Sequence, residues 1–208
     1  MRCLRIFWVV SAARSSARLL PLLLLLVAGA ASAGAQREEA LSFSVASGLH
    51  RSIDAVNAPR LVFDDAGSAQ RWLAAMSRRL AARVPDDWMR RQVLTTVQYE
   101  ARRAGLDPQL VLGLIDVESG FRKYAVSTAG ARGLMQVMPF WVRSIGDASH
   151  NLFDLKTNLR YGCTILRYYL DRENGDVFRA LGRYNGSLGE ADYPERVLAA
   201  WRGRWQWP

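Results

Sequence analysis

The segment that decides the fold is Asp107–Gln136, DPQLVLGLIDVESGFRKYAVSTAGARGLMQ, which begins as a helix and ends in a glycine-rich stretch. Asp107 suits the N-cap of a helix, and Pro108 suits its first turn, where the missing N–H costs nothing. The positions that follow are apolar almost all round the helix: Leu110, Val111, Leu112, Leu114, Ile115 and Val117. This pattern is typical of a buried helix, and Gly120 predicts its end.

A glutamate stands at the C-terminal end of this predicted helix. Glu118 shares a helix face with Leu114 and Val111, which precede it by one and two turns. A carboxyl group on an apolar face loses solvation when it ionises, which raises its pKa and suits a general acid. Two plainer interpretations stay open, because a glutamate at a helix end can also bend out to solvent or pair with an arginine.

Four motifs follow one another in order: ESGF at residues 118–121, STAGARGLMQ at 127–136, YNG at 184–186, and Tyr193. Together they resemble the lytic transglycosylases of the bacterial cell wall, of the soluble-murein-transglycosylase (SLT) type, which are related in fold to goose-type lysozyme. The resemblance covers residues 90–200, and four motifs in order are far more specific than one. It implies an all-α, lysozyme-like fold and a catalytic domain at residues 86–208.

The resemblance also implies a set of site residues. Glu118 is implied as the single acid and base that cleaves the β-1,4 bond between N-acetylmuramic acid and N-acetylglucosamine and leaves a 1,6-anhydro end. The implied substrate-binding residues are Ser127, Met135, Gln136, Tyr184, Asn185 and Tyr193, of which Tyr193 orients the acid. The Gln136 amide both donates and accepts hydrogen bonds, which suits a sugar, but bracing of the loop is an equal alternative. Met135 is of a type that more often fills a core.

The number of available acids favours a site with one carboxylate. Ordinary glycosidases use two. Asp116 lies about 200° around the helix from Glu118, so the two side chains do not face the same bond. Other acids in this region fall at predicted helix starts or in loops, where capping explains them. A hydrolytic muramidase of the same fold and a non-catalytic peptidoglycan-binding module stay open as alternatives.

The N-terminus predicts export. Residues 1–33 have the pattern of a signal peptide, with arginines, then the apolar run Leu19–Ala28, then small residues at a cleavage site. A transmembrane helix needs roughly 20 apolar residues, and a proline and a glycine interrupt this run. We therefore expect an exported protein in the periplasm of a Gram-negative-type bacterium, with no integral membrane anchor after cleavage. Residues 34–85 are predicted as an N-terminal extension with one helix, from Ser68 to Val84.

Charge and composition bound the partners. The chain of 208 residues has 28 basic and 19 acidic residues, and four of the arginines lie within residues 1–35. The mild basic excess in the rest suits a polyanionic partner such as the peptide stems of peptidoglycan. No dense basic run indicates nucleic acid. We expect a monomer that binds the peptidoglycan glycan strand without a cofactor. No metal is expected either, because His50 and His150 are far apart and no cluster has ligand spacing.

Overall fold

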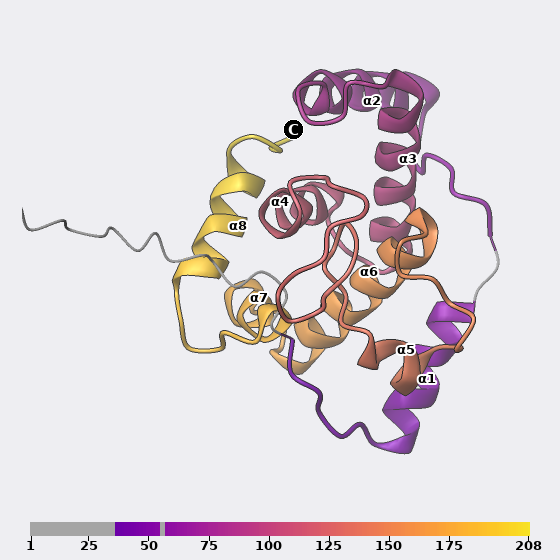
Figure 1. Ribbon diagram of the computed structural model, residues 1–208. Coiled ribbons are helices and arrows are strands. Elements are labelled where there is room, and N and C mark those ends of the chain that lie inside the picture. Colours follow the sequence, from indigo (N-terminus) through magenta and orange to yellow (C-terminus); the bar gives the residue numbers. More distant parts are fainter. Residues whose placement is uncertain (1–35, 55–56) are drawn as a thin grey trace, which may run out of the picture. The chain divides into compact units, whose positions relative to one another are not determined.

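The computed structural model describes residues 36–54 and 57–208, so the predicted signal peptide lies outside the described residues. Eight α-helices are found in this part of the chain, and Figure 1 shows their arrangement. They are α1 (Phe43–Asp54), α2 (Ala66–Leu80), α3 (Asp87–Arg103), α4 (Pro108–Glu118), α5 (Phe140–Ile145), α6 (Leu155–Arg172), α7 (Val177–Asn185) and α8 (Asp192–Arg202). The described residues form no strand, and the prediction of an all-α fold is confirmed for them.

Aspartate side chains set the starts of five helices. The capping residues are Asp65 for α2, Asp86 for α3, Asp107 for α4, Asp154 for α6 and Asp176 for α7. In each case a carboxylate oxygen accepts a hydrogen bond from a backbone N–H in the first turn, which contributes about 1 kcal/mol of helix stability. The predicted cap at Asp107, with Pro108 in the first turn, is confirmed.

The central helix α4 is buried and lies between α3 and α8 in Figure 1. It packs most extensively against α8. Gly113 makes this close approach possible, because a Cβ there would lie 2.9 Å from the backbone nitrogen of Trp201. The direct backbone contact fixes the position of α8, which carries Tyr193.

The N-terminal extension contains one helix more than the sequence predicts. The predicted helix of residues 68–84 is α2, and α1 is additional. Two carbonyls in the last turn of α1 accept hydrogen bonds from Arg103 and Arg160, which both bind the fully buried carboxylate of Glu100. These hydrogen bonds connect the end of α1 to α3 and α6, which carry Arg103 and Arg160.

No described helix is both long and apolar enough to cross a membrane.

Candidate active site

Glu118 is the last residue of α4, and its side chain is buried with only 4% of its surface exposed. Its Oε1 accepts a hydrogen bond from the Tyr193 hydroxyl at 2.6 Å, whereas Oε2 has no hydrogen-bond partner among the described residues. Burial raises the pKa of Glu118 from its ordinary 4.5 to about 8, and the Tyr193 hydrogen bond and the Arg196 charge only partly oppose this. The carboxyl group is therefore mostly protonated at pH 7.

The neighbouring carboxylate of Asp116 has other partners. It forms ion pairs with Arg83 at 2.6 Å and with Arg204 at 3.5 Å, and it accepts a hydrogen bond from the Trp205 indole at 3.0 Å. The two acids thus face different surroundings, as their separation around the helix predicts. The arginine partner that sequence reasoning left open for Glu118 belongs instead to Asp116.

Tyr193 lies in the first turn of α8 and is buried beside Glu118. Burial, together with the negative charge that Glu118 carries when ionised, raises the pKa of Tyr193 well above its ordinary value of 10. The phenol therefore stays protonated and donates its hydrogen to Glu118 Oε1. This hydrogen bond holds the carboxyl group in one orientation.

Backbone pairing within the loop that follows α4 stabilises its conformation. Arg132 forms isolated antiparallel bridges with Val126 and with Val137. At the start of the loop, the Ser119 hydroxyl donates to the Leu134 carbonyl at 2.7 Å, which joins the end of α4 to the middle of the loop. The loop predicted from its glycines therefore has a defined conformation.

The side chain of Asn158 on α6 forms hydrogen bonds with the backbone of this loop. Its Nδ2 donates to the carbonyls of Arg132 at 2.8 Å and Leu152 at 2.9 Å, and its Oδ1 accepts from the Met135 N–H at 2.9 Å. Gly133, with φ of +76°, leaves the space for this amide, because a Cβ there would collide with it. The sequence offered no local signal for this contact between α6 and the loop.

Three of the predicted substrate-binding residues hold the loop in place. The side chain of Met135 is fully buried against Gly162, and its carbonyl accepts a hydrogen bond from the Tyr184 hydroxyl at 2.7 Å. The amide nitrogen of Gln136 donates to the carbonyls of Gly133 at 2.9 Å and Ala125 at 3.2 Å. The amide nitrogen of Gln136 therefore braces the loop, which was one of the two interpretations of this residue. Its φ of +48° is strained for a residue with a side chain.

Ser127 and Asn185 lie on separate elements. The Ser127 hydroxyl accepts a hydrogen bond from the Ala131 N–H at 3.1 Å within the loop. Asn185, at the end of α7, is buried and donates to the Ser187 hydroxyl at 3.3 Å, while its Oδ1 has no partner among the described residues. The structure gives neither residue a direct hydrogen bond to Glu118 within the described part of the chain.

Two further residues were not identified from the sequence, and the first of them lies near the acid. Arg196 lies one turn after Tyr193 on α8, and its positive charge lowers the pKa of Glu118. The spacing of three residues from Tyr193 was the available signal. Gln36 is buried, and its Oε1 accepts hydrogen bonds from the Trp141 indole at 3.0 Å and from the Met138 N–H at 3.2 Å.

Among residues 36–54 and 57–208, no group of three or more His, Cys, Asp or Glu side chains is arranged to hold a metal ion.

Comparison with known proteins identifies the central part of the chain. The sequence model of the family described as "Transglycosylase SLT domain" matches residues 95–196, which include Glu118 and every predicted substrate-binding residue. The chain is 38% identical over 110 residues to a protein named "Transglycosylase" from Enterobacteria phage PRD1, covering 50% of this chain and 40% of the phage protein.

Bacterial relatives carry the name "Membrane-bound lytic murein transglycosylase C". The protein of Actinobacillus pleuropneumoniae serotype 5b (strain L20) is 55% identical over 49 residues, covering 24% of this chain and 13% of that protein. The protein of Haemophilus influenzae (strain PittEE) is 32% identical over 115 residues, covering 48% and 32%. The matched part of the chain thus spans 40% or less of the length of these relatives.

Among solved structures, an inactive mutant of lytic transglycosylase Slt from Pseudomonas aeruginosa superposes with a TM-score of 0.48 and 19% identity, covering 80% of this chain and 37% of that one.

Proposed function

Because residues 95–196 match the sequence model of the transglycosylase SLT domain, we propose that this protein is a peptidoglycan lytic transglycosylase with Glu118 as its single acid and base. It cleaves the β-1,4 bond between N-acetylmuramic acid and N-acetylglucosamine and leaves a 1,6-anhydro end. The observation that carries this proposal is the buried carboxyl of Glu118, which has a pKa of about 8 and is oriented by Tyr193. Such a group supplies the proton that a glycosidic oxygen needs in order to leave.

The first step is a proton transfer. Since Oε1 of Glu118 accepts a hydrogen bond from Tyr193, the acidic proton resides on Oε2. Oε2 gives this proton to the glycosidic oxygen, the bond from that oxygen to C1 of the muramyl sugar breaks, and N-acetylglucosamine leaves with a hydroxyl group. The positive charge that develops at C1 is stabilised with help from the acetamido group of the substrate.

The second step restores the acid. The Glu118 carboxylate accepts the proton of the C6 hydroxyl, and the C6 oxygen forms the new bond to C1, which closes the anhydro ring. No water is consumed. Asp116 is held by Arg83 and Arg204, so it is not available as a second carboxylate for activating water. This arrangement favours the lytic outcome over the hydrolytic one.

The other site residues divide into two groups in this proposal. Ser127 and Asn185 contact the sugar, and the unpartnered Oδ1 of Asn185 suits the N–H of an acetamido group. The free carbonyl oxygen of the Gln136 amide takes a similar role, because only its nitrogen braces the loop. Met135 and Tyr184 keep the loop that follows α4 in position, through the hydrogen bond from the Tyr184 hydroxyl to the Met135 carbonyl.

The place of action follows from two observations. The pattern of residues 1–33 is that of a signal peptide, and the peptidoglycan substrate lies outside the inner membrane. Bacterial relatives are named as membrane-bound lytic murein transglycosylases. We therefore propose that the chain is exported to the periplasm of a Gram-negative-type bacterium.

A digestion of purified murein sacculi tests the proposal. The products are weighed by mass spectrometry, because an anhydro end is lighter by one water than a hydrolysed reducing end. We expect anhydro ends from the wild type and from Glu195→Gln, a control that removes an exposed carboxylate on α8, but not from Glu118→Gln. Reducing ends alone would show a hydrolase, and undiminished cleavage by Glu118→Gln would exclude Glu118 as the acid.

A further inference from the structure

A group of exposed and half-buried aromatic and cationic side chains lies on the loop that follows α4 and on the loop that precedes α6. It consists of Lys123, Tyr124, Arg132 and Phe153, and we call it the shelf. The ring centroids of Tyr124 and Phe153 are 6.1 Å apart. Lys123 Nζ lies 5.3 Å from the Tyr124 ring centroid, and the Arg132 guanidinium lies 5.8 Å from that of Phe153. Each ring thus has a cation beside it.

The shelf is unusual in its exposure and charge. Tyr124 is 69% exposed, and the nearby Val126 is also largely exposed. Exposed apolar side chains gathered in one place mark binding surfaces more often than isolated ones do. The stretch from residue 119 to 146 contains four basic residues and no acidic residue; Arg143 pairs with Glu38, whereas Lys123 and Arg132 form no ion pair among the described residues. The shelf therefore suits a ligand with both an apolar face and a negative charge.

The shelf is connected rigidly to the candidate active site. Asn158 binds the backbone carbonyls of Arg132 and of Leu152, the neighbour of Phe153, and it also binds the backbone of Met135. On the other side, the carbonyl of Ala125, the neighbour of Tyr124, accepts a hydrogen bond from Gln136. The backbone that carries the shelf is therefore in a fixed position relative to the loop of the active site, which limits the ordering penalty on binding to the side chains.

We propose that the shelf binds a section of the peptidoglycan strand away from the bond that is cleaved. A sugar ring stacks on Tyr124 and Phe153, since the faces of sugar rings are apolar and match aromatic faces. A carboxylate of the attached peptide stem binds Lys123 and Arg132 through charge-assisted hydrogen bonds. This inference rests on the proposed function for the identity of the polymer.

Co-sedimentation with purified sacculi tests the aromatic half of the shelf. All variants carry Glu118→Gln, so that the polymer is not consumed. We expect Tyr124→Ala combined with Phe153→Ala to weaken binding about tenfold, which corresponds to about 1.4 kcal/mol. The matched control is Trp88→Ala, which removes an aromatic ring of similar exposure (65%) from the first turn of α3 and should leave binding unchanged.

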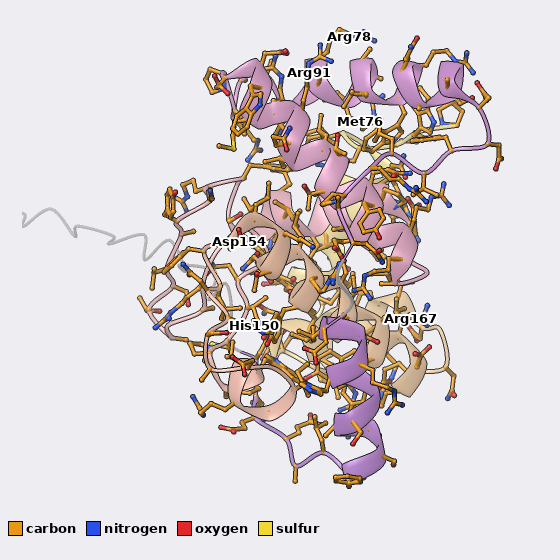
Figure 2. The ribbon with its side chains drawn as sticks, turned by 90° about the vertical axis from the view of Figure 1, so that its right-hand side faces the viewer. Met76, Arg78, Arg91, His150, Asp154 and Arg167 are labelled. Atoms are coloured by element: carbon orange, nitrogen blue, oxygen red, sulfur yellow. The ribbon has the colours of Figure 1, made fainter. Side chains whose placement is uncertain are left out.

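The cationic half is tested by charge reversal. We expect Lys123→Glu combined with Arg132→Glu to weaken binding to intact sacculi about tenfold. An amidase that removes the peptide stems also removes the cross-links and leaves soluble strands. Binding to these strands is measured by isothermal titration calorimetry, where this variant should bind as its parent does. The control Arg78→Glu reverses an exposed charge on α2. Figure 2 shows Arg78 well apart from Asp154, the neighbour of Phe153.

Several outcomes would overturn the inference. Unchanged sedimentation of both double variants would remove the shelf as a binding surface, and so would equal losses in the Trp88 and Arg78 controls. An equal loss on stripped strands would exclude the stem carboxylates as the ligand of Lys123 and Arg132. Sedimentation does not depend on cleavage, so a failure of the proposed lytic activity would appear only in the product masses. Thermal unfolding of each variant verifies that it is folded.

Discussion

Asp116 and Glu118 lie two residues apart on α4, yet their carboxyl groups have opposite surroundings. Asp116 is ion-paired with Arg83 and Arg204, whereas Glu118 is buried beside the Tyr193 hydroxyl. The first arrangement stabilises a charge, and the second disfavours one, which raises the pKa of Glu118 to about 8. The end of α4 thus carries one acid that is ion-paired and one acid whose surroundings favour the protonated form.

Replacement of Glu118 by glutamine should stabilise the protein increasingly as pH rises. Between the ordinary pKa of 4.5 and the folded pKa of about 8, the folded state binds a proton that the unfolded state has lost. The wild-type free energy of unfolding therefore falls by about 1.4 kcal/mol per pH unit in this window from this group alone. Denaturant unfolding at pH 5 and pH 8 should show a gap between Glu118→Gln and wild type that widens with pH. A gap that does not depend on pH would contradict the raised pKa.

The rate of cleavage should be constant through neutral pH and fall above about pH 8, where Glu118 loses its proton. Tyr193→Phe removes a hydrogen bond that lowers the pKa of Glu118, so the alkaline limb of kcat/KM should move to higher pH. The loss of positioning should also reduce kcat, by about tenfold. A purely structural role for Tyr193 would lower activity without moving the alkaline limb.

Asp116→Asn should reduce stability without changing the alkaline limb. The asparagine cannot pair with Arg83 and Arg204, and it remains beside the Trp205 indole. Since both arginines are partly exposed to solvent, we expect a loss of about 2 kcal/mol in the free energy of unfolding, less than for a fully buried pair. Urea unfolding measures this loss. The control Asp87→Asn removes an exposed carboxylate of α3 and should have little effect. A shifted pH profile would indicate that Asp116 takes part in the chemistry.

Asn158→Ala should lower both stability and activity. The substitution leaves the Leu152 carbonyl and the Met135 N–H without a partner, whereas the Arg132 carbonyl keeps its hydrogen bond from the Val137 N–H. Unsatisfied buried groups cost about 1–3 kcal/mol each, so two such groups give an expected total loss of at least about 2 kcal/mol. The control Asn151→Ala removes a hydrogen bond of an exposed asparagine in the next loop, and it should have a much smaller effect on thermal unfolding and on turnover. Equal effects of the two substitutions would argue against a special role for Asn158.

Much of the fold was predictable because its signals are local. The cap at Asp107, the proline that follows it and the apolar run up to Glu118 predict α4, and α4 is observed with these limits. Helix α1 was not predicted, and in the structure Arg103 and Arg160 from other helices donate hydrogen bonds to its last turn. The boundaries of the N-terminal extension, with the signal peptide at 33/34 and with the catalytic domain at 85/86, stay predictions.

The candidate site was predictable as a set of residues and less so as an arrangement. The motifs identified Glu118 and Tyr193, and the structure joins them by a hydrogen bond. The same motifs suggested sugar contacts for Met135 and Tyr184, which stay predictions; in the structure the Tyr184 hydroxyl donates to the Met135 carbonyl. Residue type and spacing do not determine the direction in which a side chain points in the folded loop.

The sequence by itself determined that an acid ends an apolar helix, since helix periodicity and capping act over a few residues. Only the tertiary structure decided the state of that acid. Arg83 comes from the turn after α2, Arg204 from the segment after α8 and Tyr193 from α8 itself, and packing alone brings them to the end of α4. Because the energy of a charge depends on its neighbours in space, this distribution gives Asp116 two arginine partners and leaves Glu118 protonated.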